Sequence, residues 1–503
     1  MKNYLQIRKT CINKRLFAAA FSIPHFPFSI SSAAFFIFNC SLFFALVSCS
    51  VQKKIATTLR ENLIDSAARV MINNPQLSTA HIGISIYDAD EKKVLYDFNG
   101  GKYFIPASNT KIATCYAAMK YLGDSLVGLK YKIKIDSVSD GIGIPDTTYI
   151  LWPTADPTFL HPDFKEQPVY DFLKKINGTI EWALPLFDKN FFGEGWAWDD
   201  NNEAYMPPKT FFPIYGNVVN FKISSGNLTV EPKYFQNKNL ISIATNKSIN
   251  ILREINSNHF YVEMNNRETK EISVPFYPSG LNIPNDLIND TIHKKIFKGF
   301  RMKYFNQNEL PFIPDIDPYF LNANKPFDLI IIHSQPTDSL LKIMMHRSDN
   351  FYAEQSLLMV SNETLGIMND EKIIDTILNS DFKNIPQKPR WVDGSGLSRY
   401  NLFTPNDFIW ILDKMRNEFS WNRITTIFQS GGTGTLSDYY KNFPGKIFAK
   451  SGTLSNNLAL SGYSITPKNK TLIFSVMVGN HMDSNADVRK SIEDFLTSVI
   501  QNY

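Results

Sequence analysis

Cysteine is scarce in this chain, and this scarcity excludes two kinds of stabilising chemistry. The 503 residues contain four cysteines, Cys11, Cys40, Cys49 and Cys115. Their distribution provides no framework for disulfide pairing and no Cys/His spacing typical of a zinc site. We therefore expect no structural disulfide, no bound metal and no cofactor.

A basic excess is also missing from most of the chain. The formal charge is +4, but residues 1–48 hold five of the 52 basic residues and no acidic one. The remainder carries 47 basic and 48 acidic residues, a net charge of −1 that leaves no nucleic-acid footprint. No serine lies in a Gly-x-Ser-x-Gly pattern, which argues against an α/β-hydrolase. An apolar content of 44% and the length indicate a globular chain of two or three domains.

The N-terminal segment has the features of an export signal. A basic front is followed by a mostly apolar stretch, 33–47, and by Leu46-Val47-Ser48-Cys49. This ending resembles the lipobox of bacterial lipoproteins, in which residues 1–48 are removed and the new N-terminal Cys49 is lipidated. An uncleaved anchor is the alternative, although the apolar stretch is shorter than the roughly 20 residues of a spanning helix. Either alternative exports the rest of the chain and tethers it to a membrane.

After the N-terminal segment, a β-rich central region, 126–332, separates two regions in which helices and strands are mixed. The patterns predict a helix over 55–72, a hairpin over 81–96, short strands between Pro, Gly and Asn clusters over 126–332, helices within 338–416, strands over 458–465 and 472–478, and a helix over 487–500. We expect one sheet built from both ends of the chain. The predicted domains are a split catalytic domain, 49–125 with 333–503, and an inserted β-rich region, 126–332, with two subdomains.

Ser108 and Lys111 form a Ser-x-x-Lys motif that opens an Ala-rich run. A helix beginning near Ser108 would place the two side chains on one face, because residues three apart on a helix are neighbours. A neutral lysine there could accept the serine proton, and the helix dipole would favour the alkoxide. Ser108 is therefore a candidate nucleophile and Lys111 its candidate base. The motif alone is weak, since it recurs by chance.

Ser348 and Asn350 form a second element, Ser-x-Asn, and a third, Lys450-Ser451-Gly452-Thr453, follows it. Ser348 could pass a proton to a leaving amine, and Asn350 could orient Lys111 and a substrate amide. Lys450 is a second cation that would help to keep Lys111 neutral.

The third motif also offers groups that could bind substrate. The Ser451 or Thr453 hydroxyl, with Lys450, could hold a substrate carboxylate. Gly452 would let substrate backbone approach the strand closely. The backbone N–H groups of Ser108 and Thr453 would form an oxyanion hole.

Ser-x-x-Lys, Ser-x-Asn and Lys-Ser-Gly, in this order, resemble the motif set of penicillin-binding proteins and serine β-lactamases. The first two serines are 240 positions apart, and 102 positions separate Ser348 from Lys450. A long insertion between the first two motifs is similar to that of peptidase family S13, the penicillin-binding protein 4 type of D-alanyl-D-alanine carboxypeptidase/endopeptidase. Three further segments match this family: Asp156-Pro157-Thr158, 348–354 and Asp-Gly-Ser-Gly-Leu-Ser-Arg at 393–399.

The resemblance implies a fold, an activity and partners. The fold would be α+β and multidomain, a penicillin-binding-protein/β-lactamase-like transpeptidase fold whose antiparallel sheet is flanked by helices, with a large β-rich insertion. The activity would be that of a periplasmic serine DD-peptidase acting on peptidoglycan peptides through an acyl-enzyme, releasing D-Ala or cutting D-Ala-diaminopimelate cross-links. β-Lactam antibiotics would acylate the same serine.

The family also binds the free end of the diaminopimelate side chain. By matching positions, Asp156 would bind its amine, and Arg399 with Ser455 its carboxylate. The alternative is a structural turn at Asp156 and an ordinary surface position for Arg399. Two departures from the family pattern are Lys-Ser-Gly in place of Lys-Thr-Gly, which keeps the hydroxyl, and 153–155 in place of the usual glycines.

Two other functions remain open. A β-lactamase of the class A type would need Glu-x-x-Leu-Asn between the second and third motifs, and 350–450 contains no such sequence. A non-catalytic cell-wall or penicillin sensor would have no physical use for a lysine paired with a serine, yet all five polar motif residues are intact.

Overall fold

A computed structural model describes residues 63–135, 147–183, 185–187, 190–237, 239–265, 267–278, 282–292 and 329–503. The chain divides into two compact units, Met1–Arg60 and Glu61–Tyr503, and only the second is described below. The predicted signal peptide, 1–48, and Cys49 lie outside the described residues. Among the helices within the described ranges, none is both long and apolar enough to cross a bilayer.

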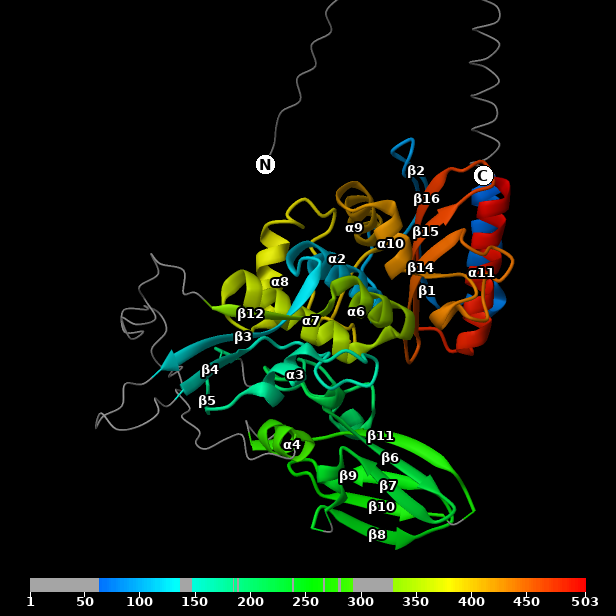
Figure 1. The fold of residues 1–503 in the computed structure, drawn as a ribbon. Helices are drawn as coiled ribbons and strands as arrows, with labels where there is room; N and C mark the ends of the chain where they lie inside the picture. Colours follow the sequence, from blue (N-terminus) through cyan, green and yellow to red (C-terminus); the bar gives the residue numbers. More distant parts are fainter. Residues whose placement is uncertain are drawn as a thin grey trace, which may run out of the picture. The chain divides into compact units, whose positions relative to one another are not determined.

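One antiparallel sheet joins the two ends of this unit (Figure 1). Its strands, in spatial order, are β13 (Gln429–Ser430), β14 (Ile447–Leu454), β15 (Asn457–Ile465), β16 (Thr471–Gly479), β1 (His81–Asp88) and β2 (Lys93–Phe98). β1 pairs with β16 from His81 opposite Gly479 to Asp88 opposite Leu472. The prediction of a single sheet built from both ends of the chain is confirmed.

Helices cover both faces of this sheet, so its central strands are buried on both sides (Figure 1). The helix over 63–72 and α11 (Asn485–Asn502) cover one face, where they pack on Leu458 and Leu460. The other face packs on Ala459 and Tyr463 and belongs to the larger helical core. Nearly every residue of β15 and β16 is buried, which explains their continuous apolar sequence.

The helices on the second face hold the first two motifs. They are α2 (Lys111–Tyr121), α6 (Thr337–Ile343), α7 (Asn350–Leu365), α8 (Asp370–Asn379), α9 (Pro405–Glu418) and α10 (Trp421–Ile427). α7 begins at a cap in which Asp349 accepts from the Tyr352 N–H at 2.9 Å, and it ends at Gly366, whose φ is +70°. Asp caps and left-handed Gly ends are typical helix boundaries.

The part of the insertion that the structure describes contains three sheets and two α-helices. The first sheet has the order β12 (Ile330–Pro336), β3 (Ser125–Ile135), β4 (Thr147–Pro153) and β5 (Thr179–Trp182). The second sheet has the order β11 (Lys270–Pro275), β6 (Val218–Ser224) and β7 (Asn227–Glu231). The third has the order β8 (Ile241–Thr245), β10 (Phe260–Met264) and β9 (Asn250–Arg253). The helices are α3 (Pro168–Lys175) and α4 (Asn282–Ile292).

The insertion leaves and rejoins the catalytic region at neighbouring strands. β3 and β12 are antiparallel, with Ser125 opposite Pro336. This pairing brings the start and the end of the insertion together. The first two motifs can therefore lie close in space although 240 positions separate their serines. Buried side chains from all three sheets form one hydrophobic cluster, from Leu129 to Ile292. The division of the insertion into two subdomains stays a prediction.

Candidate active site

Ser108 lies in a tight turn immediately before α2. The turn is a 3-10 helix, Ala107–Thr110, and the α-helix begins only at Lys111. Lys111 Nζ nevertheless lies 3.0 Å from Ser108 Oγ. The predicted helix near Ser108 is present, but its first turn is a 3-10 turn, so any help from the helix dipole acts on a residue just before α2.

Two glycines from distant segments contact the turn that carries Ser108. A Cβ on Gly452 of β14 would lie 2.5 Å from the Pro106 carbonyl oxygen and 3.1 Å from the Ser108 nitrogen. A Cβ on Gly396, whose φ is +81°, would lie 1.9 Å from the Ala107 carbonyl oxygen. Only glycine allows the third motif and the 393–399 segment to pack this closely against the turn.

Lys111 is fully buried and directed at three oxygens. Its Nζ lies 2.7 Å from Asn350 Oδ1, 2.7 Å from the Ser395 carbonyl oxygen and 3.0 Å from Ser108 Oγ. A neutral amine has two hydrogens and one lone pair. If the hydrogens go to Asn350 and Ser395, which only accept at these oxygens, the lone pair is left for the Ser108 hydroxyl. The geometry thus suits Lys111 as a proton acceptor.

Burial also adjusts the basicity of Lys111. It lowers the pKa of the amine to about 8, against the opposing influence of the Asp393, Glu354 and Asp349 charges. Desolvation disfavours the charged form of a lysine. A useful fraction of Lys111 is therefore neutral near physiological pH.

The second motif contacts both lysines. Ser348 ends a short π-helical turn with a φ of +60°, and its Oγ accepts from Lys450 Nζ at 2.8 Å. Asn350 begins α7 and donates its Nδ2 to the Tyr205 carbonyl oxygen at 2.8 Å, while its Oδ1 faces Lys111. Tyr205, which belongs to the insertion, therefore fixes which end of the Asn350 amide meets the lysine.

Lys450 is the second buried amine of the site. Besides Ser348, its Nζ donates to the Ser451 carbonyl oxygen at 2.6 Å. Burial lowers its pKa well below the ordinary lysine value, and repulsion from Lys111 lowers it further. The charge of Lys111 thus disfavours a charge on Lys450, and the Ser348 hydroxyl is the side-chain group to which Lys450 could pass a proton.

Two buried carboxylates accept hydrogen bonds from the backbone of the segment whose Ser395 carbonyl contacts Lys111. Glu354 accepts from the Ser395 N–H at 2.7 Å, so it holds the carbonyl that contacts Lys111. Asp393 accepts from the Gly396 N–H at 2.7 Å and from Trp196 Nε1 at 2.9 Å. Burial, followed by repulsion from Asp393, raises the pKa of Glu354 to about 7. Both carboxylates lie in segments that match the family, but no role was predicted for them.

The hydroxyls of the third motif lie on the other face of β14 from Lys450. Side chains alternate along a strand, so Lys450 and Gly452 face Ser108 while Ser451 and Thr453 face α11. Ser451 Oγ lies 2.5 Å from Thr435 Oγ1. Thr453 Oγ1 accepts from Arg489 Nη2 at 2.9 Å. No pattern in the sequence pointed to Thr435 or Arg489.

The residues predicted to bind diaminopimelate fall into two places. Arg399 and Ser455 are exposed, and Arg399 Nη2 donates to the Ser455 carbonyl oxygen at 3.1 Å. Asp156 is 3% exposed, and both its oxygens accept from Thr158, at 2.9 and 3.0 Å. Burial raises the pKa of Asp156. The structure brings Arg399 to Ser455, whereas Asp156 is buried next to Gly128 of β3.

An ionic cluster ties the insertion to the second motif. Arg347 donates to Asp163 at 3.0 and 2.6 Å and to Asp349 at 3.1 and 3.0 Å. The Tyr352 hydroxyl donates to Asp163 at 2.7 Å and lies 2.9 Å from His161 Nδ1. Because these residues flank Ser348 and Asn350, the cluster fixes the start of α7.

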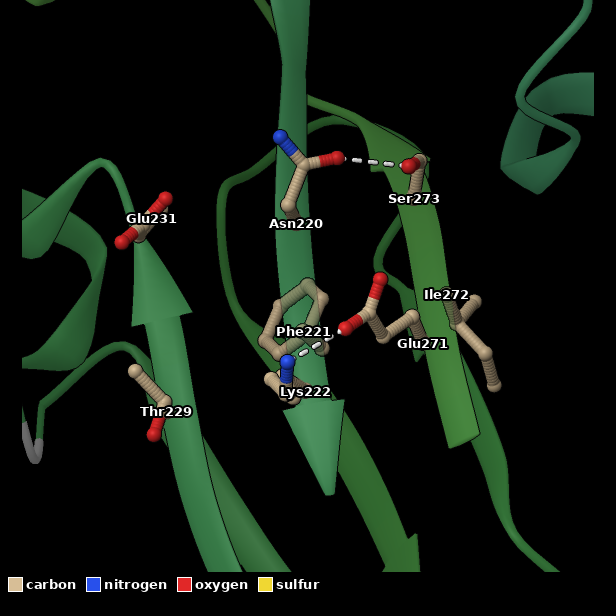
Figure 2. A pocket seen from close by; sticks show the side chains of 8 residues that line it. All are labelled: Asn220, Phe221, Lys222, Thr229, Glu231, Glu271, Ile272 and Ser273. Carbon is tan, nitrogen blue, oxygen red and sulfur yellow. Dashed lines mark hydrogen bonds and ion pairs between the residues drawn. The ribbon is translucent and has the colours of Figure 1, made fainter. Parts of the chain in front are cut away.

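Figure 2 shows a cavity of about 270 Å³ on the outward face of β6, β7 and β11. Two pairs of its polar side chains bond to each other: Lys222 pairs with Glu271 at 2.7 Å, and Ser273 Oγ donates to Asn220 Oδ1 at 2.6 Å. No predicted site residue lines it, and we assign it no part in the chemistry.

Comparison with known proteins gives consistent matches. The model of the D-Ala-D-Ala carboxypeptidase 3 (S13) family matches residues 64–274 and 322–500. D-alanyl-D-alanine carboxypeptidase DacB of Haemophilus influenzae is 22% identical over 446 residues, covering 80% of this chain and 86% of that protein.

Solved structures agree with the fold. Penicillin binding protein 4 (dacB) from Haemophilus influenzae is 19% identical, with a TM-score of 0.64 over 86% of this chain and 97% of that one. The structure of the same protein complexed with a novel β-lactam is 17% identical in sequence, with a TM-score of 0.62 over 86% of this chain and 97% of that one. The predicted α+β penicillin-binding-protein-like fold is confirmed.

Proposed function

The chain belongs to the D-Ala-D-Ala carboxypeptidase 3 (S13) family, and we propose that Ser108 carries its serine peptidase activity through a covalent acyl-enzyme. The observation that supports this most is the convergence on Lys111. One buried amine contacts Ser108 of the first motif and Asn350 of the second. Lys450 of the third motif contacts Ser348. The five predicted catalytic residues thus form two hydrogen-bonded groups, Ser108 and Asn350 around Lys111 and Ser348 with Lys450.

Acylation starts with proton transfer from Ser108 Oγ to the neutral Lys111 Nζ. The oxygen then attacks the carbonyl carbon of the penultimate D-Ala, and the C–O bond forms as the amide C–N bond breaks. The leaving amine needs one proton, which the Ser348 hydroxyl supplies while taking another from the ammonium form of Lys450. Backbone N–H groups of Ser108 and Thr453 would stabilise the oxyanion.

Deacylation is the same chemistry with water as the nucleophile. Acylation leaves Lys111 protonated and Lys450 neutral, so Lys111 first loses its proton to solvent and Lys450 regains one from solvent. Lys111 then accepts a proton from the water as the water oxygen bonds to the carbonyl carbon, and it passes this proton to Ser108 Oγ as the ester C–O bond breaks. The products are a shortened stem peptide and free D-Ala, or two separated stem peptides if the leaving group is diaminopimelate. A penicillin ring would acylate Ser108 by the same first step, and its amine would stay attached.

Labelling with a fluorescent penicillin tests this assignment. The wild-type protein and a Ser380→Ala control should be labelled, and Ser108→Ala should not. Ser380 is an exposed serine at the end of α8, which makes it a matched control. Labelling of Ser108→Ala would contradict the assignment of Ser108 as the nucleophile. Rapid turnover of the penicillin would indicate a β-lactamase, and labelling without release of D-Ala from peptides would indicate a sensor.

We propose that Arg399 and Ser455 bind the diaminopimelate carboxylate and that Asp156 binds its amine. Arg399→Ala should then lower kcat/KM for a diaminopimelate-containing peptide more than for a D-Ala-D-Ala peptide lacking that side chain. Asp156→Asn, which keeps the volume of the buried side chain, should show the same bias. Equal losses on both peptides would exclude the pocket.

We also propose that residues 1–48 are removed and that Cys49 is lipidated, tethering the enzyme on the periplasmic side of the cell envelope. The sequence Leu46-Val47-Ser48-Cys49 supports this. Cells fed a clickable fatty acid should label the wild type and a Cys115→Ser control, because Cys115 is buried in the core. Absence of label from the wild type would contradict lipidation, and Cys49→Ala should abolish it.

A further inference from the structure

Lys209 is a buried lysine of the insertion that lies against the helices of the catalytic region. Its side chain is 3% exposed, and its Nζ forms an ion pair with Asp370, the first residue of α8. The next residue, Thr210, is fixed to α7: its N–H donates to Gln355 Oε1 at 2.9 Å, and its carbonyl oxygen accepts from Gln355 Nε2 at 2.8 Å. Because Gln355 follows Glu354 in α7, this docking holds Lys209 near a buried carboxylate of the active site.

Three carboxylates from different segments act on the Lys209 amine. They are Asp370 of α8, Glu354 of α7 and Asp393 of the 393–399 segment. Burial lowers the pKa of Lys209, but these charges and the hydrogen bond to Asp370 outweigh it, so the pKa is raised and the amine stays charged. Trp196 of the insertion belongs to the same cluster: its ring centroid lies 5.9 Å from Lys209 Nζ, and its Nε1 donates to Asp393 at 2.9 Å.

Glu354 depends on this cation for its charge. Its oxygens accept from the Gly394 N–H at 3.2 Å and from the Ser395 N–H at 2.7 Å. Burial, followed by repulsion from Asp393, raises the pKa of Glu354 to about 7, and the charge of Lys209 opposes both effects. Like charges that share a buried site disfavour each other. Without Lys209, Glu354 would therefore hold a proton at neutral pH.

The charge of Glu354 in turn acts on the catalytic base. Glu354 holds the Ser395 N–H, and the Ser395 carbonyl oxygen lies 2.7 Å from Lys111 Nζ. The charges that raise the pKa of Lys111 are those of Asp393, Glu354 and Asp349. Lys450 is the cation on the other side, and its own pKa is lowered by Lys111.

The effect of Lys209 on Lys111 therefore runs through Glu354. Lys209 is not among the charges that act most on Lys111, so direct repulsion between the two amines is the smaller effect. Loss of Lys209 lets Glu354 take up a proton, and a neutral Glu354 no longer favours the charged form of Lys111. The pKa of Lys111 should then fall.

We propose that Lys209 is a positioning residue of the catalytic centre, which holds Glu354 as a carboxylate and thereby sets the pH range in which Lys111 accepts the Ser108 proton. This inference rests on the proposed function and deepens it, because it makes the insertion a regulator of the catalytic base. The insertion contributes a buried charge here, without contact between Lys209 and the substrate.

The test is the second-order rate constant of labelling by a fluorescent penicillin, measured from pH 6 to 9. Lys209→Gln should move the acid limb of the profile to lower pH, by up to about one unit. Lys209→Arg keeps the charge and should keep the wild-type limb. Lys222→Gln removes the cation of an exposed ion pair elsewhere in the insertion, and this matched control should keep it too. In a Glu354→Gln background, Lys209→Gln should add no further shift.

Asp370→Asn separates the charge of Lys209 from the structural role of its ion pair. This variant breaks the same pair but leaves the cation, and the charge of Asp370 raises the pKa of Glu354. Glu354 should therefore stay ionised, and the acid limb should not move to lower pH. Equal shifts in Asp370→Asn and Lys209→Gln would mean that the pair only supports the fold. That result would overturn the inference, as would an unmoved limb in Lys209→Gln or the same shift with and without Glu354.

A double variant keeps the test if Lys209→Gln does not fold. Lys209→Gln with Asp370→Asn leaves neither charge unpaired. Lys209 acts more strongly on Glu354 than Asp370 does, so a smaller shift to lower pH is expected, and an unmoved limb would overturn the inference. All these contrary results still leave Ser108 labelled and the proposed function intact. A wild-type protein that penicillin does not label would contradict the proposed function and the inference with it.

Discussion

Changing Lys111 to arginine keeps a positive charge in the site and removes the ability to give up its proton. In the structure the lone pair of a neutral Lys111 is left for Ser108, because Asn350 and Ser395 offer only acceptor oxygens. The variant should therefore fold and bind ligand but acylate poorly. A lost general base typically costs a factor of about 10²–10⁴.

The pH dependence of the wild type follows from the same amine. A free lysine has a pKa of about 10.4, and burial lowers that of Lys111 to about 8. The neutral fraction should then rise from about 1% at pH 6 to about 10% at pH 7 and about 90% at pH 9. Acylation by penicillin should follow this fraction, so its rate constant rises as pH rises.

The assay is the second-order rate constant of labelling by a fluorescent penicillin, measured from pH 6 to 9 in wild type, Lys111→Arg and Lys120→Arg. Lys120 is a matched control in the same helix, where arginine can keep the ion pair with Asp381. Wild type and Lys120→Arg should show the same acid limb. A flat profile in the wild type, or wild-type rates in Lys111→Arg, would refute Lys111 as the base.

Two further substitutions probe the surroundings of this amine. The charge of Glu354 raises the pKa of Lys111, so Glu354→Gln should move the acid limb of the labelling profile to lower pH, by up to about one unit; a shift to higher pH would contradict this coupling. Gly396→Ala would place a Cβ 1.9 Å from the Ala107 carbonyl oxygen at a φ of +81°, and it should abolish labelling and cost at least about 2 kcal/mol in urea unfolding. Gly123→Ala is its control, with a φ of +67° but open space around it, and should cost only about 1 kcal/mol; equal costs would show that packing against the turn is unimportant.

The parts of the site that could be predicted from sequence are those whose residues lie in short, ordered motifs. Ser108 and Lys111 are three positions apart, and local geometry alone brings them together. Ser348 and Lys450 could be identified because their motifs recur in a fixed order, not because their 2.8 Å contact could be foreseen. Alternating and continuous apolar runs likewise identified β1, β15 and β16, because the apolar pattern of a strand reflects which of its faces are buried.

What could not be predicted depends on contacts between distant segments. Tyr205 acts through a backbone carbonyl, which leaves no signal in the side-chain pattern. Arg489 reaches Thr453 only because α11 packs on the back of β14, and Asp163 meets Arg347 only because the insertion folds onto α7. The 3-10 form of the turn at Ser108 could not be predicted either, because Gly396 and Gly452, which pack against this turn, lie far from it in sequence.

Peptide mapping of the trapped acyl-enzyme tests the central claim most directly. Trypsin should release residues 103–111, Tyr103 to Lys111, from the penicillin-treated protein. We expect this peptide to gain the mass of one penicillin, with fragmentation locating the adduct on Ser108 and not on Tyr103 or Thr110. An adduct on any other residue, or an unmodified 103–111 peptide in fully labelled protein, would contradict the assignment of Ser108 as the nucleophile.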